Sequence, residues 1–167
     1  MASYGPTEYS ALCRWMFFHG GQIPDNVVPG GDDKGGEVAY VGRAVHSGDV
    51  LPGKVIRSRG LCYVPYGGKE FEYTDYQALV SEGATLEWLP GSDGSVPSGA
   101  LPGGKTASGE QLYIGRARHE GMLIPGKVHP SIKCAFIPYE GKEYRYAEYE
   151  VLVSKTISFR EAKERRD

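Results

Sequence analysis

The stretch YVGRAVHSGDVLPGKV, residues 40–55, decides the fold because it returns as YIGRARHEGMLIPGKV at residues 113–128. The shift between the two is about 73 residues, and it also carries Trp15 onto Trp88 without a gap. Roughly 29 of about 68 aligned positions are identical, which chance does not produce. The chain therefore contains two tandem copies of one repeat.

The repeats occupy residues 13–81 and 86–154, with a charged tail at residues 155–167. An open solenoid usually needs three or more repeats for stability. We therefore expect the two copies to close against each other as one domain with pseudo-two-fold symmetry. In the tail, Ser158 followed by Glu161 resembles a capping box and predicts a short charged helix or a solvated tail.

The composition favours an all-β fold. The chain of 167 residues has 24 Gly, 11 Pro and 12 Tyr, a combination typical of short strands joined by tight turns. A chain of this length buries roughly 70% of its unfolded surface and needs no metal or disulfide to hold it. The three cysteines are an odd number, which indicates reduced thiols.

The charge and the apolar pattern argue against a nucleic-acid partner and against a transmembrane segment. With a net charge of −2, the chain has no basic surplus to neutralise a phosphate backbone, so no nucleic-acid partner is expected. No apolar run is long enough for a transmembrane segment, and no basic and apolar leader opens the chain. We therefore expect a cytoplasmic protein that is released by a non-classical route or associates with vesicles.

The sequence LPGKV, which returns as IPGKV, places Pro before Gly, and this order predicts a type II turn. Lys54 and Lys127 would follow that turn directly. There they are either solvated turn lysines or donors for a hydroxylated ligand.

An acidic loop in the first repeat contains Asp32, Asp33 and Glu37. A carboxylate accepts hydrogen bonds from adjacent hydroxyls and a lysine donates to them, which is suitable chemistry for binding a sugar. In the second repeat Lys105 and Thr106 replace the two aspartates, so the two sites cannot be equivalent.

Other motifs carry no clear chemistry. Residues 99–106, GALPGGKT, match the phosphate-loop pattern, but the following residues predict a strand where a helix is required. His46 and His119 recur in the repeat and favour structural hydrogen bonds over catalysis. The sequence shows no nucleophile with a base at a recognisable spacing, and no histidine or cysteine pattern with zinc spacing. We therefore expect that the protein is not an enzyme and binds no metal and no cofactor.

These motifs, together with YVPYGGKEFEYTDYQALV and IPYEGKEYRYAEYEVLV, resemble the DM9 repeat family of invertebrate and fish proteins. The resemblance implies two repeats that exchange strands in one all-β, pseudo-two-fold unit. It also implies mannose-type glycan binding without calcium, as in lectins for pattern recognition in innate immunity. By position, Asp33 and Lys54 would contact the sugar, with Asp32 as the alternative register. The second repeat keeps the lysine as Lys127 but has Thr106 in place of the aspartate, so one good site per chain is expected; either Thr106 and Glu110 rescue weak binding there, or the second repeat does not bind sugar.

Two functions follow as hypotheses. The first is a calcium-independent lectin whose partners are mannose-type glycans and whose weak single sites gain avidity in a homodimer. The alternative is an intracellular interaction or vesicle-associated protein, responsive to infection or stress, in which the sugar pocket is vestigial.

Overall fold

A computed structural model describes residues 3–10 and 12–155. Within this part the chain forms strands and three short 3₁₀ turns, with no α-helix, which confirms the predicted all-β class. The helix predicted around Ser158 lies outside the described residues. The described part contains no helix that could cross a membrane. The strands are β1 (Glu8–Ser10), β2 (Cys13–His19), β3 (Pro29–Asp32), β4 (Val38–His46), β5 (Asp49–Ile56), β6 (Leu61–Tyr66), β7 (Lys69–Tyr73), β8 (Asp75–Ser81), β9 (Leu86–Ser92), β10 (Pro102–Lys105), β11 (Gln111–His119), β12 (Met122–His129), β13 (Cys134–Tyr139), β14 (Lys142–Tyr146) and β15 (Glu148–Ser154), and the 3₁₀ turns are η1 (Lys34–Gly36), η2 (Arg57–Arg59) and η3 (Pro130–Ile132).

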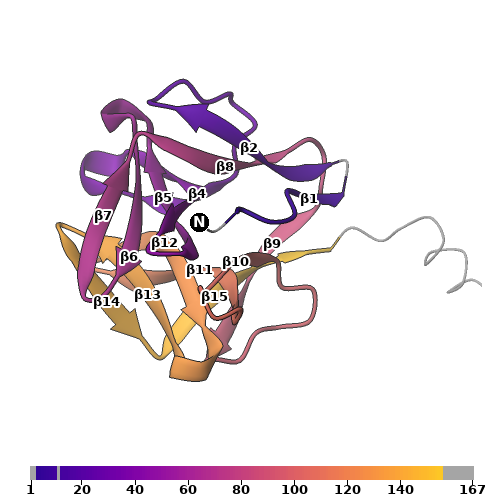
Figure 1. The fold of residues 1–167 in the computed structure, drawn as a ribbon, viewed down its shortest axis with the longest axis vertical. Helices are drawn as coiled ribbons and strands as arrows, with labels where there is room; N and C mark the ends of the chain where they lie inside the picture. Colours follow the sequence, from indigo (N-terminus) through magenta and orange to yellow (C-terminus); the bar gives the residue numbers. More distant parts are fainter. Residues whose placement is uncertain (1–2, 11, 156–167) are drawn as a thin grey trace, which may run out of the picture.

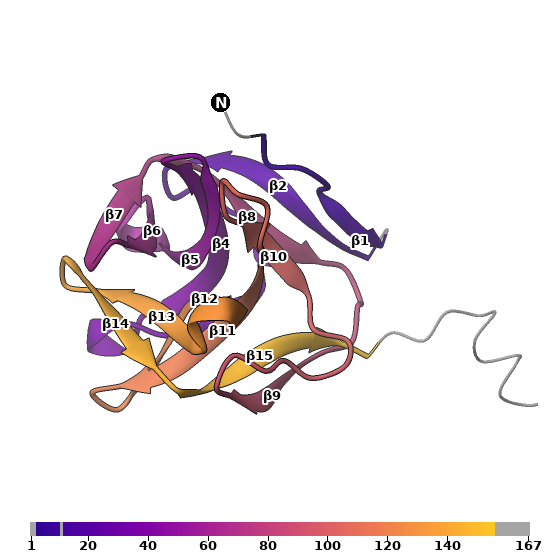
Figure 2. The same ribbon diagram turned by 60° about the horizontal axis from the view of Figure 1, so that its bottom comes forward.

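The strands close into an antiparallel barrel. Hydrogen-bonded neighbours run β5, β6, β7, β14, β13, β12, β11 and β10, and β10 returns to β5 through the pair Lys105 and Val50. The repeats meet on the other side where β7 pairs with β14, at Lys69 and Lys142. The strands β8 and β2 extend the sheet beyond β4, and β15 and β9 extend it beyond β11 (Figures 1 and 2).

The two repeats have the same strand plan. Each strand from β2 to β8 has its counterpart from β9 to β15 at the shift seen in the sequence. The strand β10 belongs to the second repeat but pairs with β5 of the first as well as with β11, and this pairing confirms that the repeats share strands. The strand β1 alone has no counterpart, and it covers the outer edge of β2.

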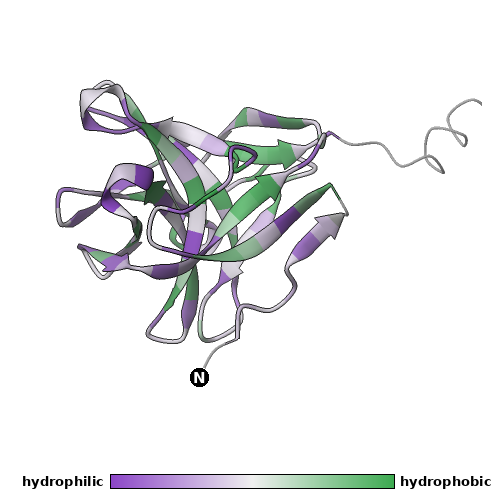
Figure 3. Ribbon diagram, turned by 90° about the horizontal axis from the view of Figure 1, so that it is seen from above, coloured by the Kyte–Doolittle hydropathy of each residue, from purple (hydrophilic) through white to green (hydrophobic). Residues whose placement is uncertain are grey.

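The core has three main parts. One lies within each repeat, and a third crosses the pseudo-two-fold axis, where Trp15, Val41 and Leu79 of the first repeat meet Leu101 and Ile114 of the second. The most hydrophobic stretches lie on the strands, whereas the connecting turns are largely hydrophilic or neutral (Figure 3). A core shared between the copies explains why they form one unit, since neither copy alone could bury these side chains.

The Pro-Gly pairs are not turns, so the type II turn prediction is wrong. Pro52 and Gly53 lie inside β5, opposite β4, and the chain reverses earlier, at Ser47 and Gly48, which both have positive φ. Glycine is required at position 53 for another reason. A Cβ there would lie 2.0 Å from the carbonyl oxygen of Tyr63, so a side chain would separate β5 from β6.

Candidate functional site

Lys54 lies inside the barrel wall and not at a solvated turn. Its strand β5 has polar and apolar residues that are all buried from Val50 onward, and Lys54 itself is only 1% exposed. A buried ammonium needs compensating charge, because its transfer from water is costly. The solvated-lysine interpretation is therefore wrong for this residue.

Two carboxylates compensate Lys54. Its Nζ lies 3.6 Å from Oδ1 of Asp33 and 3.6 Å from Oε2 of Glu70. Asp33, which is 3% exposed, follows β3, and Glu70 lies on β7. Burial lowers the pKa of Lys54, and the charges of Glu70 and Asp33 oppose this effect. We call these three residues the Lys54 centre.

Aromatic rings from both repeats line the Lys54 centre. The ammonium lies 5.5 Å from the ring centroid of Tyr63 on β6 and 5.3 Å from that of Tyr139 on β13. A cation over an aromatic face is attracted by the ring's negative quadrupole. Because Tyr139 comes from the second repeat, the centre is complete only when the two repeats are packed together.

Two basic side chains cover the centre from the solvent side. Nη2 of Arg59 lies 3.1 Å from Oδ2 of Asp33, and its guanidinium lies 5.7 Å from the Tyr63 ring. Lys34 forms an ion pair with Glu140 and lies 5.7 Å from the Tyr139 ring. The side chains of Arg59 and Lys34 are 45% and 57% exposed, so the cover is a solvated layer over a buried centre.

A second centre surrounds Lys127, which is 5% exposed. Its Nζ donates to the carbonyl oxygen of Pro65, 2.9 Å away, and lies 3.3 Å from Oε2 of Glu143. The rings are Phe136 of its own repeat and Tyr66 of the first, at 5.3 and 5.7 Å. Burial lowers the pKa of Lys127, and the charge of Glu143 opposes this effect.

A comparison with known families assigns the chain. The model of the DM9 repeat matches residues 33–146, which is more than half of the sequence and includes both lysine centres. The chain belongs to the DM9 repeat family.

Two proteins of Thalassophryne nattereri are similar in sequence to this chain. Natterin-3 is 32% identical over 144 residues, which cover 83% of this chain and 36% of natterin-3. Natterin-4 is 31% identical over 142 residues, which cover 83% of this chain and 33% of natterin-4. The DM9 chain thus spans about a third of the length of these relatives.

The fold has a solved counterpart. The crystal structure of the nematode sperm cell motility protein MFP2B superposes with a TM-score of 0.70 and 20% sequence identity. The match covers 92% of the DM9 chain and 49% of the nematode protein. At this identity the likeness shows the fold alone.

The structure brings together only some of the residues predicted for the sugar site. Asp33 and Lys54 meet, as expected for DM9 repeats. Asp32 is exposed at the end of β3 and pairs with Val38. Of the two aspartates, Asp33 is therefore the one that faces Lys54. Glu37 lies apart from Lys54, because its carboxylate accepts hydrogen bonds from Ser58.

Glu37 joins its loop to η2 through two hydrogen bonds. Its Oε1 accepts from the hydroxyl of Ser58 at 2.6 Å and its Oε2 accepts from the Ser58 amide at 3.0 Å. The Ser58 hydroxyl lowers the pKa of Glu37. Glu110 accepts the same two bonds from Ser131 in the second repeat.

Thr106 does not replace the carboxylate of Asp33. Its hydroxyl accepts from the Glu110 amide at 3.0 Å, within its own loop. A carboxylate reaches this region from the other repeat instead. Oδ1 of Asp49 accepts from the Ala107 amide at 2.7 Å. Burial lowers the pKa of Lys127, and the charge of Asp49 joins that of Glu143 in opposing this effect.

Glu70 and the ring of Tyr139 were not predicted from the sequence. Both positions are recognisable in the sequence as repeated, since Glu143 and Tyr66 are their counterparts. Their contacts with Lys54 could not be predicted, because only the pairing of β7 with β14 brings a ring of one repeat over a lysine of the other.

The repeat histidines have aromatic neighbours. Nδ1 of His46 lies 2.5 Å from the hydroxyl of Tyr73, and His119 pairs with Tyr146 in the same way. The three cysteines are buried and free, and burial raises the pKa of Cys62. Among the described residues, no group of three or more His, Cys, Asp or Glu side chains could hold a metal ion.

Proposed function

We propose that this DM9 protein binds mannose-type glycans at the Lys54 centre, without calcium, as a lectin for pattern recognition. Asp33 would accept hydrogen bonds from adjacent sugar hydroxyls and Lys54 would donate to them. The rings of Tyr63 and Tyr139 would supply apolar contact area beside the sugar.

One observation carries the proposal. Oδ2 of Asp33 and Oε2 of Glu70 are buried, and among the described residues neither accepts a hydrogen bond of ordinary geometry. Their charged neighbours are Nη2 of Arg59, 3.1 Å from Oδ2, and Nζ of Lys54, 3.6 Å from Oε2. Buried acceptors almost always accept a hydrogen bond, because one without it forfeits its interaction with water. Hydroxyl groups of a ligand would satisfy both oxygens, and the ammonium between them would remain to donate.

Binding requires the basic cover to move. Exposed ion pairs contribute about 0–1 kcal/mol, so separating Lys34 from Glu140 is easy. Arg59 must leave Asp33, and two sugar hydroxyls would take its place on the carboxylate. This exchange predicts weak binding at each site, with useful avidity only in a dimer or on clustered glycans.

Calcium is not needed in this scheme. A calcium site offers several oxygen ligands to the cation. Here the position between Asp33 and Glu70 holds the ammonium of Lys54. The positive charge that a metal would bring is already part of the chain.

The test is calorimetric titration of mannose into the wild type and into Asp33→Asn, with a chelator present. The asparagine keeps the shape of the side chain and removes its charge, and circular dichroism would check that the variant is folded. We expect the binding heat to disappear in Asp33→Asn and to persist in the matched variant Thr106→Ala, whose hydroxyl serves only its own loop. Equal heats for the wild type and Asp33→Asn would refute the proposed site.

A second variant separates ligand binding from structural support. Arg59→Ala removes the competitor for Asp33 and leaves the buried centre in place. If sugar displaces Arg59, this variant binds mannose more tightly than the wild type. Unchanged or lost binding would show that Asp33 is not the acceptor.

The burial of the centre favours one other function. Lys54 and Asp33 are 1% and 3% exposed, and Lys54 lies under the ring of Tyr139 from the second repeat, as expected for charges that only hold the repeats together. The protein would then be an interaction protein, responsive to infection or stress, with a vestigial pocket. No heat with mannose in the wild type or in Arg59→Ala would favour this alternative.

A further inference from the structure

The two repeats differ at their outer edges. In the first repeat, residues 3–10 run along β2, and β1 pairs with it at Glu8 and Arg14. In the second repeat the counterpart of β2 is β9, whose neighbour among the described residues is β15 alone. Among the described residues, the outer edge of β9 therefore offers unpaired backbone groups before its last residue, Ser92, which bonds to Ser95.

The amino-terminal segment is held on the first repeat by Arg43. The ring of Tyr4 lies 5.5 Å from the guanidinium, and Nη2 donates to the carbonyl oxygen of Pro6 at 3.3 Å. Burial raises the pKa of Tyr4, and the backbone of Val45 and the side chain of Tyr73 lie near enough to influence it. These contacts place the first tyrosine of the segment against β4 and β7.

The same segment is held further along by Trp15. Its backbone amide donates to the carbonyl oxygen of Thr7 at 2.6 Å, and its Nε1 donates to the hydroxyl of Tyr9 at 2.9 Å. The Tyr9 hydroxyl donates in turn to the carbonyl oxygen of Pro102. Burial raises the pKa of Tyr9 to about 12, so this second tyrosine is an anchor inside the protein.

The second repeat has counterparts of Arg43 and Trp15, but no described segment lies on them. Arg116 lies 4.3 Å from the ring of Trp88, as Arg43 does from the ring of Trp15. Nη1 of Arg116 donates to the Gly30 carbonyl at 3.1 Å, as Arg43 does to Gly103 at 3.0 Å.

The third bond of Arg43, from Nη2 to a backbone carbonyl, has no counterpart on Arg116 among the described residues. Likewise no described residue accepts from Nε1 of Trp88. Within residues 3–10 and 12–155, the second repeat therefore has unpaired donors at both positions where the first repeat holds the segment.

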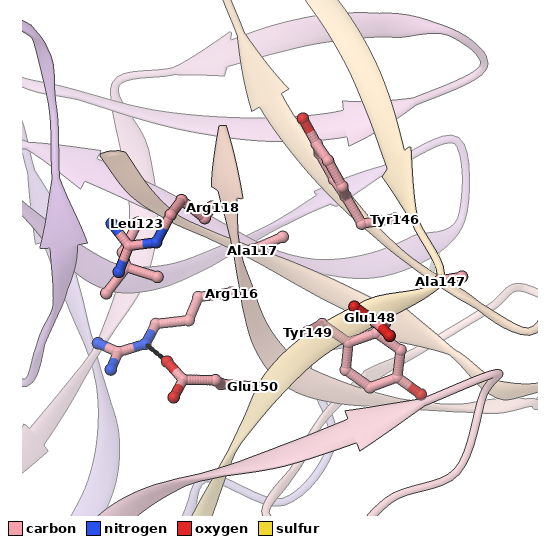
Figure 4. A pocket seen from close by; sticks show the side chains of 9 residues that line it. All are labelled: Arg116, Ala117, Arg118, Leu123, Tyr146, Ala147, Glu148, Tyr149 and Glu150. Atoms are coloured by element: carbon pink, nitrogen blue, oxygen red, sulfur yellow. Dashed lines mark hydrogen bonds and ion pairs between the residues drawn. The ribbon is translucent and has the colours of Figure 1, made fainter. Parts of the chain in front are cut away.

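Two hollows stand where the tyrosines would lie (Figure 4 shows the first). One, of about 690 Å³, is bounded by Arg116, Arg118 and Tyr146, which are the counterparts of the Arg43, Val45 and Tyr73 around Tyr4. The other, of about 380 Å³, is lined by Trp88 and Pro29, the counterparts of the Trp15 and Pro102 that bind Tyr9.

We propose that this face of the second repeat is a docking groove for an extended segment of a partner protein. The segment would carry Tyr, any residue, Pro, two residues and Tyr, and would lie along the edge of β9. Adding a strand to a sheet edge, with side chains in alternate pockets, is a common mode of peptide recognition. The segment that the chain lays on its own first repeat is the template for this ligand.

The charge of the ligand differs from that of the template at one position. Where the segment lies on the first repeat, Glu8 lines one cavity together with Lys105 of β10. The counterpart of Lys105 is Asp32, which is exposed. A basic residue should therefore precede the second tyrosine of the ligand, because a glutamate there would face an aspartate.

The test is fluorescence anisotropy of two labelled peptides with the full chain. The first is Ser-Tyr-Gly-Pro-Thr-Lys-Tyr-Ser, and the second has glutamate in place of lysine, as in the chain itself. We expect the lysine peptide to bind several-fold more tightly than the glutamate peptide. Equal affinities, or the reverse order, would overturn the assignment of Asp32 to ligand recognition.

Matched variants locate the site. Ala147→Trp fills the larger hollow from an exposed position, and Thr74→Trp makes the same change at the counterpart in the first repeat. We expect at least a tenfold loss of affinity in Ala147→Trp and no loss in Thr74→Trp.

Absence of binding to the wild type, or an equal effect of the two variants, would refute the groove. Dimerisation of the wild type that rises with concentration and is lost in Ala147→Trp would reassign the groove to the segment of a second copy.

Discussion

Replacing Lys54 by methionine tests whether the lysine centre is a compensated charge cluster. The substitution keeps much of the apolar stem and removes the ammonium. It leaves Asp33 and Glu70 facing each other, with Arg59 as the remaining cation near Asp33. We expect strong destabilisation, although an exposed lysine could be replaced with almost no effect.

The magnitude follows from the distances. Each ion pair at 3.6 Å contributes roughly 5 kcal/mol of attraction at an effective dielectric constant of about 20. Removing the charges from water costs several kcal/mol per ion, so the intact cluster is close to neutral in net free energy. Removing one partner of such a cluster costs about 3–5 kcal/mol, because the remaining charges stay buried.

The assay is urea denaturation at pH 7, with two controls. Lys127→Met leaves one nearby carboxylate, Glu143, and should lose less stability than Lys54→Met. Adding Asp33→Asn and Glu70→Gln to Lys54→Met removes the uncompensated charge and should recover most of the loss. Wild-type stability in Lys54→Met, or no recovery in the triple variant, would refute the reasoning.

Three further predictions rest on single contacts. Gly53→Ala forces a Cβ to within 2.0 Å of the Tyr63 carbonyl oxygen, so we expect the free energy of unfolding to fall by about 1–3 kcal/mol or more. Calorimetry would show this as a lower Tm, and an unchanged Tm would contradict the close approach. The Ser58 hydroxyl lowers the pKa of Glu37, so the stability that the Glu37 carboxylate contributes is present above its ordinary pKa of 4.5 and is lost as pH falls through the lower folded-state pKa. In urea titrations, Glu37→Gln should therefore be less stable than wild type at pH 6 and match it at pH 3. A difference that does not change with pH would argue against the bond between Glu37 and Ser58. Burial raises the pKa of Cys62, so iodoacetamide at pH 8 should leave this thiol unmodified in the native protein and alkylate it in urea, as read by mass spectrometry, whereas rapid native labelling would show that the thiol is accessible.

The candidate site was only partly predictable. Repetition singled out Lys54 and Lys127, and the resemblance to DM9 repeats paired Lys54 with Asp33. The local interpretation of Pro52 and Gly53 as a turn was wrong, because glycine in a strand can also serve a close backbone approach. Sequence patterns do not distinguish the two uses, since both depend on the missing Cβ.

The sequence by itself determined that the chain contains two copies of one β unit, and that two copies, too few for an open solenoid, pack against each other. It did not determine where the strands begin and end, since Pro52 and Gly53 were expected in a turn and lie inside β5. Only the tertiary structure decided that each lysine is buried under a ring from the other repeat, and that the amino-terminal segment fills one groove and leaves its counterpart open. These features depend on contacts between residues far apart in the chain, and local patterns do not encode distances across the barrel.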